Sequence, residues 1–178
     1  KTTPVAGDVK YVDRNGDGVV DDNDRDIIGN PNPDFTYGFQ TKVSWKSLSL
    51  SASFNGVQGR DILNVGNRYN NTPGTKSNNV TRKAFQNMWT DENPSNLYPK
   101  STFVVQNMVM DRYVEDGSYL RCSDITLSYV LPAKWTNKIG IKNTSVYASV
   151  KNAFVITDYS GYDPEVNSFA FDGLRPGV

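Results

Sequence analysis

Residues 35–55 read FTYGFQTKVSWKSLSLSASFN, and two runs of alternating polarity fill this stretch. In residues 35–45 the larger aromatic and β-branched side chains take every second position. In residues 48–55 leucine, alanine and phenylalanine alternate with serine and asparagine. A period of two places one kind of side chain on each face of a β-strand. The short Lys46-Ser47 connection therefore predicts an antiparallel hairpin.

The length of these two runs is informative. Each is about ten residues, the length of a tilted strand that crosses a membrane. Their polar face carries small uncharged side chains apart from Lys42, as expected for a wet interior wall. A soluble sheet with one face on a core produces the same alternation, so the period alone leaves both arrangements open.

Two more alternating runs follow a long interruption. The four predicted strands cover residues 35–45, 47–57, 119–131 and 144–156. Between the second and third, residues 58–117 show no regular alternation, and Gly, Asn, Thr and Pro crowd residues 66–79, which predicts a loop. Residues 81–89 predict a short helix. So long an irregular segment is unusual in a compact soluble domain and normal for the outer loops of a barrel.

The composition excludes several classes of protein. Among 178 residues, Lys plus Arg and Asp plus Glu both total 19, so no charge imbalance indicates a nucleic-acid partner. The chain has no histidine, which excludes histidine acid–base catalysis, Ser-His-Asp triads and most zinc sites. The single Cys122 has no partner for an intrachain disulfide and is interpreted as a packed small residue.

A calcium-loop motif precedes the first strand. Residues 13–24 read DRNGDGVVDDND, with Gly18 at the sixth position, where such a loop turns sharply. An EF-hand ends in a bidentate Glu, whereas this run ends in the shorter Asp24. The alternative is a polar surface loop rich in Asp, Asn and Gly. The predicted Ca²⁺ ligands are Asp13, Asn15, Asp17, Val19 through its carbonyl, Asp21 and Asp24.

Catalysis is not expected. Glycosidase chemistry needs two flanking acids, and the sequence pairs none of the carboxylates outside the loop, whose neighbours are typical of turns: Asp111, Glu115, Asp116, Asp163 and Glu165. The aromatic candidates for stacking on sugars are Trp89, Tyr98, Trp135, Tyr159 and Tyr162. The alternative is local packing for the loop aromatics, and a membrane-interface belt is an equal interpretation for Trp45 and Trp135 near strand ends. Lys42 and Lys151 fall on polar faces and either line a lumen or are solvated.

Several phrases, in their order along the chain, resemble the C-terminal part of a SusC/RagA-type TonB-dependent outer-membrane transporter. They span nearly the whole sequence. These phrases are GDVKY at 7–11, IIGNPNP at 27–33, FTYGF at 35–39, MWT at 88–90 with ENP at 92–94, EDGSYLR at 115–121 and YSGYDPEV at 159–166.

The resemblance implies an all-β, antiparallel, 22-stranded barrel in the outer membrane of a Gram-negative bacterium. Such proteins import oligosaccharides or peptides beneath a SusD-like lipoprotein lid, with energy passed through TonB. Residues 1–34 would form an extracellular loop with the calcium-like motif, and residues 35–178 barrel strands with extracellular loops 58–117 and 157–178. The chain carries no plug, no TonB-contacting segment and no closing aromatic strand, so a C-terminal piece of the barrel is expected.

Barrel topology then assigns sides of the membrane. Bacterial barrels have short periplasmic turns and long outer loops, which places Lys46-Ser47 in the periplasm and residues 58–117 outside. Counting back one strand places residues 13–24 outside, near the mouth where lid and substrate meet. The metal is then expected to order this loop.

The alternative class is a soluble calcium-binding, β-rich carbohydrate-binding or adhesion module. A dockerin needs a second loop copy with helices after each, and a lectin sandwich does not account for residues 58–117. Detergent dependence separates these classes from a membrane protein.

Overall fold

The computed structural model describes residues 5–71, 79–101, 109–141, 143–167 and 175–176. The chain divides into two compact units. The strand unit comprises residues 31–61 and 116–159, and the loop unit comprises residues 1–30, 62–115 and 160–178. Each unit is described by itself.

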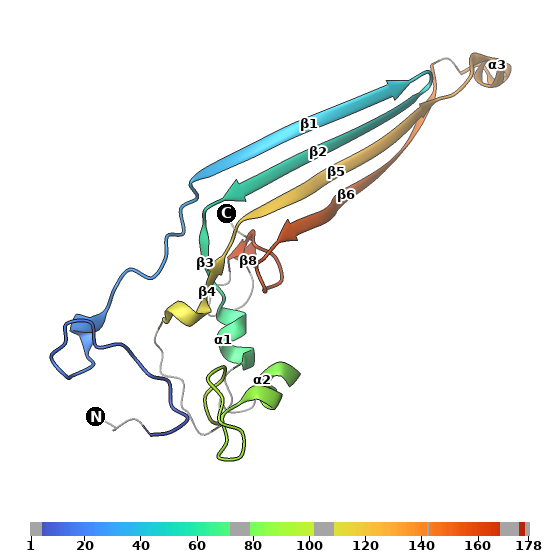
Figure 1. Ribbon diagram of the computed structural model, residues 1–178. Coiled ribbons are helices and arrows are strands. Elements are labelled where there is room, and N and C mark those ends of the chain that lie inside the picture. Colours follow the sequence, from blue (N-terminus) through green and yellow to red (C-terminus); the bar gives the residue numbers. More distant parts are fainter. Residues whose placement is uncertain (1–4, 72–78, 102–108, 142, 168–174, 177–178) are drawn as a thin grey trace. The chain divides into compact units, whose positions relative to one another are not determined.

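Four long antiparallel strands make up the strand unit, side by side in the order β1-β2-β5-β6 (Figure 1). No bound differs by more than one residue from the range that the alternation predicts. The sheet has open edges at β1 and β6, so these four strands do not close a barrel. The strands are β1 (Phe35–Trp45), β2 (Leu48–Gln58), β5 (Tyr119–Val130) and β6 (Ser145–Thr157).

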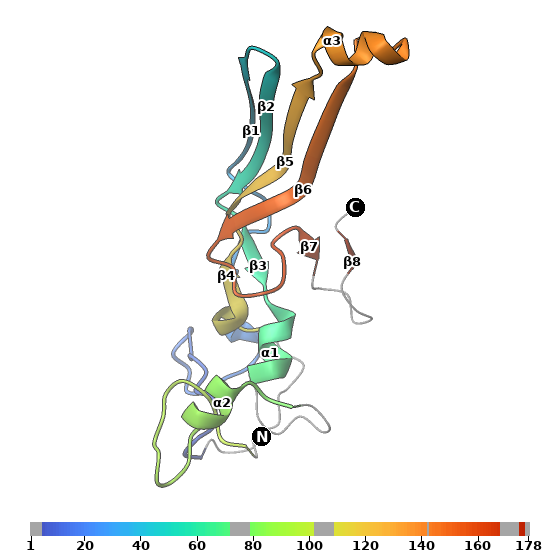
Figure 2. The same cartoon turned by 90° about the vertical axis from the view of Figure 1, so that its right-hand side faces the viewer.

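Both short connections lie at one end of this sheet. The β1–β2 turn consists of Lys46 and Ser47, and Lys46 adopts a left-handed backbone with φ 54°. Strand β5 leads to β6 through α3 (Ala133–Thr136) and the 3₁₀ turn η3 (Asn137–Ile139), which follow the ends of these strands (Figure 2). All long segments therefore leave the sheet from the opposite end.

The strand register gathers the apolar side chains on one face. Residues directly opposite each other on neighbouring strands share a face, and Phe39 lies opposite Phe54 with ring centroids 4.6 Å apart. Further rows of this apolar face extend over the four strands. They are Val43, Leu50, Leu127 and Ala148; Thr41, Ala52, Ile125 and Val150; and Trp45, Leu48, Tyr129 and Val146.

This apolar face has no protein layer over it in the part of the chain that the structure describes. Val43 is 64% exposed, Val150 57% and Phe154 44%. Soluble monomeric proteins rarely expose an apolar surface that extends over four strands. Such a surface marks a site of contact with another protein or with a membrane. The described helices include none that is long and apolar enough to span a bilayer.

Two adjacent β-bulges interrupt the sheet at one level. On the β2 side, consecutive residues Ser53 and Phe54 pair with Asp124 and Cys122, which leaves Ser123 as an extra residue of β5. On the β6 side, Ser123 faces two residues, Asn152 and Ala153, of which Asn152 has φ 49°. A bulge bends its strand and re-aims the side chains around it.

The bulge in β5 changes which positions are apolar. Between the bulge and the short-turn end, Ile125 and Leu127 lie on the apolar face. On the other side of the bulge, Cys122 and Leu120 lie on that same face. Without an extra residue the two sets would point to opposite sides. Cys122 is fully buried, as expected for a small side chain in a row that holds Phe54 and Phe154.

A close approach near the long-segment end of the sheet requires glycine. The Tyr37 hydroxyl donates a hydrogen bond to the Tyr119 carbonyl at 3.4 Å and passes over Gly56. A Cβ on Gly56 would lie 2.3 Å from Tyr37 Cζ and 2.7 Å from the Tyr119 oxygen. Any side chain at this position would displace the tyrosine or the backbone.

The loop unit has more regular structure than the sequence predicts. The predicted helix at 81–89 is present as α2 (Arg82–Asn87), with Thr81 as its N-cap. The prediction of a loop over residues 66–79 is wrong for residues 66–71, and residues 72–78 lie outside the described part. The elements inside the segment expected to be irregular are β3 (Asp61–Leu63), α1 (Val65–Asn71), α2, η2 (Asp111–Tyr113) and β4 (Val114–Asp116).

Two very short strands occur in the segment expected to be an extracellular loop, residues 157–178. Strand β7 (Val166–Asn167) pairs antiparallel with β8 (Arg175–Pro176). Such short pairs have no periodicity that a sequence could reveal. Residues 102–108, 168–174 and 177–178 of the two predicted extracellular loops lie outside the described residues.

Candidate functional site

The first half of the predicted calcium loop is a series of side-chain-to-backbone turns. The two Asp13 carboxylate oxygens accept hydrogen bonds from the Gly16 and Gly18 N–H groups at 2.7 and 2.8 Å. The Asn15 side-chain oxygen accepts from Asp17 N–H at 2.9 Å, and Asp17 accepts from Val19 N–H at 2.8 Å. Asp and Asn form such turns readily, so the loop is shaped by the side chains predicted to bind the metal.

The last predicted ligand closes the loop. Asp24 Oδ1 accepts a hydrogen bond from Arg14 N–H at 2.8 Å, and its Oδ2 accepts from Asp21 N–H at 2.8 Å. Asp21 in turn caps the 3₁₀ turn η1 (Asp22–Asp24). The hydrogen bonds from Asp21 N–H and Arg14 N–H hold the pKa of Asp24 below its usual range. Asp24 is therefore ionised at neutral pH, as a calcium ligand must be.

The structure brings the predicted ligands into one loop but turns their oxygens to the backbone. Among the described residues, no group of three or more acidic, histidine or cysteine side chains is arranged to hold a metal. A carboxylate oxygen that accepts one N–H hydrogen bond retains a second lone pair. The same oxygens can therefore still coordinate a metal ion. The calcium site stays a prediction.

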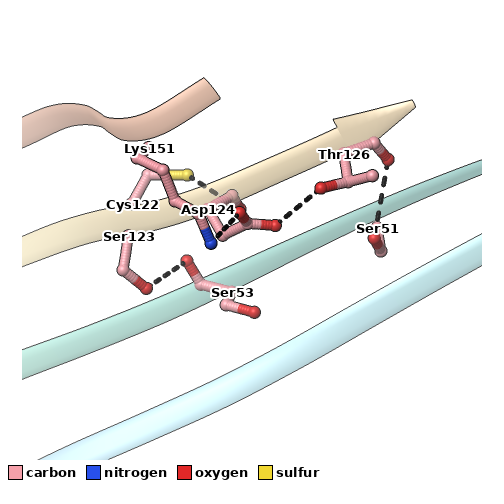
Figure 3. Close-up of polar contacts among 7 residues, drawn as sticks. All are labelled: Ser51, Ser53, Cys122, Ser123, Asp124, Thr126 and Lys151. Carbon is pink, nitrogen blue, oxygen red and sulfur yellow. Dashed lines mark hydrogen bonds and ion pairs between the residues drawn. The ribbon is translucent and has the colours of Figure 1, made fainter. Parts of the chain in front are cut away.

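The polar face of the sheet carries a small network beside the bulges (Figure 3). The Lys151 ammonium lies 2.9 Å from Asp124 Oδ2, and the Thr126 hydroxyl donates to Asp124 Oδ1 at 2.9 Å. The Ser123 hydroxyl donates to the Ser53 carbonyl at 3.2 Å. Lys151 is thus ion-paired, and it remains largely exposed, so this pair adds little stability. The network makes this face hydrophilic.

The candidate aromatic residues occupy different environments. Trp45 ends β1 and Trp135 lies in α3, both at the short-turn end, and they are 68% and 64% exposed. Lys46 lies over the Trp45 ring at 4.8 Å, a pairing suited to a membrane interface. Tyr159 is buried, Tyr162 is almost fully exposed, and Trp89 and Tyr98 line a cavity of the loop unit.

Most candidate catalytic carboxylates have turn-forming roles. Asp111 accepts a hydrogen bond from Arg112 N–H, and Asp116 accepts from Ser118 N–H, both at 2.8 Å. Asp163 accepts from Glu165 N–H at 2.8 Å. The Asp116 and Asp163 contacts reach two residues ahead, as in Asx turns, and the Asp111 contact is with its neighbour, so all three are local and agree with the turn interpretation.

Glu115 has a different role, which the sequence does not reveal. Its Oε1 accepts hydrogen bonds from the Asn64 and Asn67 amides at 3.0 and 2.9 Å, and Ser160 donates its hydroxyl at 2.9 Å and its backbone N–H at 2.8 Å. Asn64, which is 3% exposed, also accepts from Asn67 N–H at the start of α1. Glu115 of β4 thus connects the start of α1 with the segment after β6, and its partners Asn64 and Ser160 lie 51 and 45 residues from it in the sequence.

The ionisation of Glu115 follows from these contacts. Partial burial alone would raise the pKa of Glu115, but the hydrogen bonds from Ser160, Asn67 and Asn64 stabilise the carboxylate and lower the pKa below its usual value. Glu115 is therefore charged at neutral pH and is a structural acceptor.

Several known proteins are similar to this chain in sequence and in fold. The chain is 34% identical over 175 residues to TonB-dependent receptor P26 of Formosa agariphila, and 34% identical over 165 residues to TonB-dependent receptor SusC of Bacteroides thetaiotaomicron. The RagAB peptide importer in its open-open state superposes on 78% of the chain with a TM-score of 0.66 and 32% identity. The chain belongs to the SusC/RagA family of TonB-dependent receptors.

The match covers most of this chain and a small part of its relatives. It includes 96% of the chain and 17% of receptor P26, 89% and 15% for SusC, and 15% of the matching chain of the RagAB importer. The chain therefore spans about one sixth of the length of these SusC/RagA relatives. No protein-family model matches it.

Membership of the family has two direct consequences. TonB-dependent receptors reside in the outer membrane of Gram-negative bacteria, which agrees with the predicted localisation. They are receptors and transporters, not enzymes, which agrees with the interpretation of the carboxylates as turn residues.

Proposed function

We propose that this chain forms part of a TonB-dependent transporter that imports oligosaccharides or peptides together with a SusD-like surface lipoprotein. The observation that carries the proposal is the sheet, which has one exposed apolar face and one mainly polar face. A membrane-spanning barrel wall needs both, because lipid contacts one side and water the other.

Barrel geometry indicates which parts of the whole receptor this chain would form. Four strands with two open edges cannot enclose a channel, and open sheet edges are not tolerated in lipid. The chain would therefore supply wall and loops, whereas the channel needs the remaining strands and TonB would act on another part of the polypeptide. The family includes RagAB, which is described as a peptide importer. Both peptides and oligosaccharides are therefore proposed as substrate classes.

A labelling experiment on the complete receptor tests the orientation. In a Cys122→Ser background, Asn23→Cys in the calcium-like loop is expected to react with a membrane-impermeant maleimide on intact cells, because this loop would be extracellular. Lys46→Cys in the short turn is expected to react only after the outer membrane is permeabilised. Reaction of both cysteines from the same side would contradict the proposed topology.

We further propose that residues 13–24 bind Ca²⁺ as a structural ion. The donor chemistry supports this, because carboxylates, an amide oxygen and the Val19 carbonyl are the hard oxygen ligands that calcium prefers. Asp24 is ionised and lies against the backbone of Arg14, so one short loop holds the first and last predicted ligands near each other. The ion would order the loop that leads into β1.

Removal of calcium is expected to loosen residues 8–30 and to leave the four strands intact. Hydrogen exchange of the detergent-solubilised receptor, with calcium and with a chelator, measures both regions. Asp24→Asn is expected to weaken calcium binding about tenfold or more in a calorimetric titration, because the closing ligand loses its charge. Asp22→Asn is the matched control, since Asp22 lies in the same loop and is not a predicted ligand. Equal affinity of the two variants would contradict the assignment.

A further inference from the structure

A cavity of about 480 Å³ lies within the loop unit, outside the calcium-like loop and the sheet. Its volume falls in the range of small-molecule sites, roughly 300–1,000 Å³. Three segments that are distant in the sequence form its walls. The lining residues are Gly7, Asp8, Val9 and Lys10; Trp89, Ser95, Asn96, Tyr98 and Pro99; and Asp111 with Arg112.

Backbone contacts hold the first two walls together. Lys100 N–H donates to the Gly7 carbonyl at 2.9 Å, and Trp89 N–H donates to the Tyr98 carbonyl at 3.0 Å. Gly7, with φ 85°, packs so closely that a Cβ there would lie 2.5 Å from the Trp89 ring. The indole is thus held against a glycine, and its position is set before any ligand arrives.

Charged side chains fix the remaining contacts. Asp8 and Lys100 form an ion pair at 3.0 Å, and each side chain is 23% exposed. The Arg112 guanidinium donates to the Leu97 carbonyl at 2.7 Å and lies over the Tyr113 ring at 5.4 Å. Arg112 therefore ties the third wall to the second. A preorganised cavity of this kind loses little entropy when it binds a ligand.

The lining is suited to a neutral ligand with many hydroxyl groups. The rings of Trp89 and Tyr98 offer apolar surface, and Ser95, Asn96 and Asp111 offer hydrogen-bonding side chains. Asp8 is paired with Lys100, and the other charged lining residues are Lys10, Arg112 and Asp111, so this cluster carries only one net charge. Pyranose rings present apolar C–H faces and polar edges, which match this combination.

The backbone contacts disfavour an extended peptide as the ligand. Peptides commonly bind by adding a strand to a free edge. Here Gly7 bonds to Lys100, and residues 88 and 98 already pair in a bridge, so these edges are partly used within the protein. Recognition in this cavity would depend mainly on side chains, which suits a saccharide better than a peptide.

We propose that this cavity is a binding subsite for one or two units of a neutral oligosaccharide. Trp89 and Tyr98 contact the sugar faces, and Asn96 and Asp111 bond its hydroxyl groups. The proposal rests on the proposed function, since it narrows the transported class to glycans and gives them a contact site on the loops. It adds a site that is separate from the polar face of the sheet.

Calorimetric titration of the complete detergent-solubilised receptor with maltotetraose, cellotetraose, xylotetraose and mannotetraose tests the site. At least one of these sugars is expected to bind. Asn96→Ala and Tyr98→Leu are each expected to weaken that binding about fivefold or more, because a hydrogen bond or an apolar contact is lost. Asn137→Ala, an exposed asparagine beside α3, is the matched control and is expected to bind like the unmodified receptor.

Three results would overturn the saccharide subsite. They are no binding of any of the four sugars, undiminished binding by both cavity variants, and binding of tetra-alanine that the same variants weaken. None of these affects the maleimide labelling of Asn23→Cys and Lys46→Cys, which reports on the proposed function independently. A receptor that passes the labelling test and fails the titration would thus retain its membrane role and lose this subsite.

Discussion

Replacing Val150 by lysine is expected to destabilise the folded receptor in a lipid bilayer by about 2–4 kcal/mol, the cost of a lysine on the lipid face near the bilayer midplane. Val150 lies near the middle of β6, opposite Ile125 of β5, and its side chain is 57% exposed. If the apolar face contacts lipid, the ammonium group must be buried in hydrocarbon or bend the bilayer towards it.

The neighbouring residue supplies the control for this prediction. Ser149 lies opposite Thr126 on the polar face, so Ser149→Lys is expected to change stability by less than about 1 kcal/mol. Guanidinium unfolding of the receptor in phospholipid vesicles, followed by tryptophan fluorescence, gives both values. Equal losses for the two variants would refute the assignment of faces, and a larger loss for Ser149→Lys would reverse it.

Replacing Glu115 by alanine is expected to release the segment after β6 from α1, with a local loss of roughly 2–4 kcal/mol. The substitution removes an ionised acceptor of four hydrogen bonds. It also leaves the buried Asn64 amide without its charged partner. Hydrogen exchange at the Asn67 and Ser160 amides measures the release, and Asp116→Ala, whose carboxylate contacts the nearby Ser118, is the control.

Acidification is expected to reproduce the effect in the unmodified receptor. The folded-state pKa of Glu115 is lowered from 4.5, so its contribution is present above that value and is lost as the pH falls through the folded pKa. Protection of the Ser160 amide should therefore fall in acid in the unmodified receptor and show no such step in Glu115→Ala. A pH-independent amide in both proteins would show that the Glu115 contact does not hold this segment.

The strands were predictable because their signal is local and repeated. In residues 35–45 and 48–55 apolar positions alternate with polar or small ones. This pattern arises because successive side chains of a strand point to opposite faces of the sheet. The turn at Lys46 is short enough that the register follows from it. The membrane environment did not follow from this alternation, since a soluble sheet would share it. The resemblance to a family of barrels was needed for that step.

Helix α1 illustrates what was missed. Its sequence, VGNRYNN, consists largely of poor helix formers, which explains the loop prediction. It nevertheless forms a helix because Asn64 caps its start and Asn67 is held by Glu115, a residue distant in the sequence. Tertiary contacts override weak local propensity here, and no window of sequence contains them.

The candidate sites divide in the same way. The calcium-like loop is contiguous, so its ligand spacing is visible in residues 13–24 alone, although the metal itself stays untested. The cavity combines residues 7–10, 89–99 and 111–112, and the sequence indicated only Trp89 and Tyr98 as individual sugar-binding candidates. Their meeting with Asn96 and Arg112 depends on the folded loop unit.

The paired bulges at Ser123 and Asn152 shift the alternation in β5 and leave it unbroken in the other three strands. In β5 the positions on the apolar face are even at Leu120 and Cys122 and odd at Ile125 and Leu127, whereas β6 keeps even-numbered positions there throughout. Sequence alignments within the family that assume an unbroken period of two would assign the wrong face to one half of β5. Loss of the extra residue Ser123 would turn one half of β5 to the opposite face, so a continuous apolar face over the four strands depends on one residue that does not itself lie in the apolar rows.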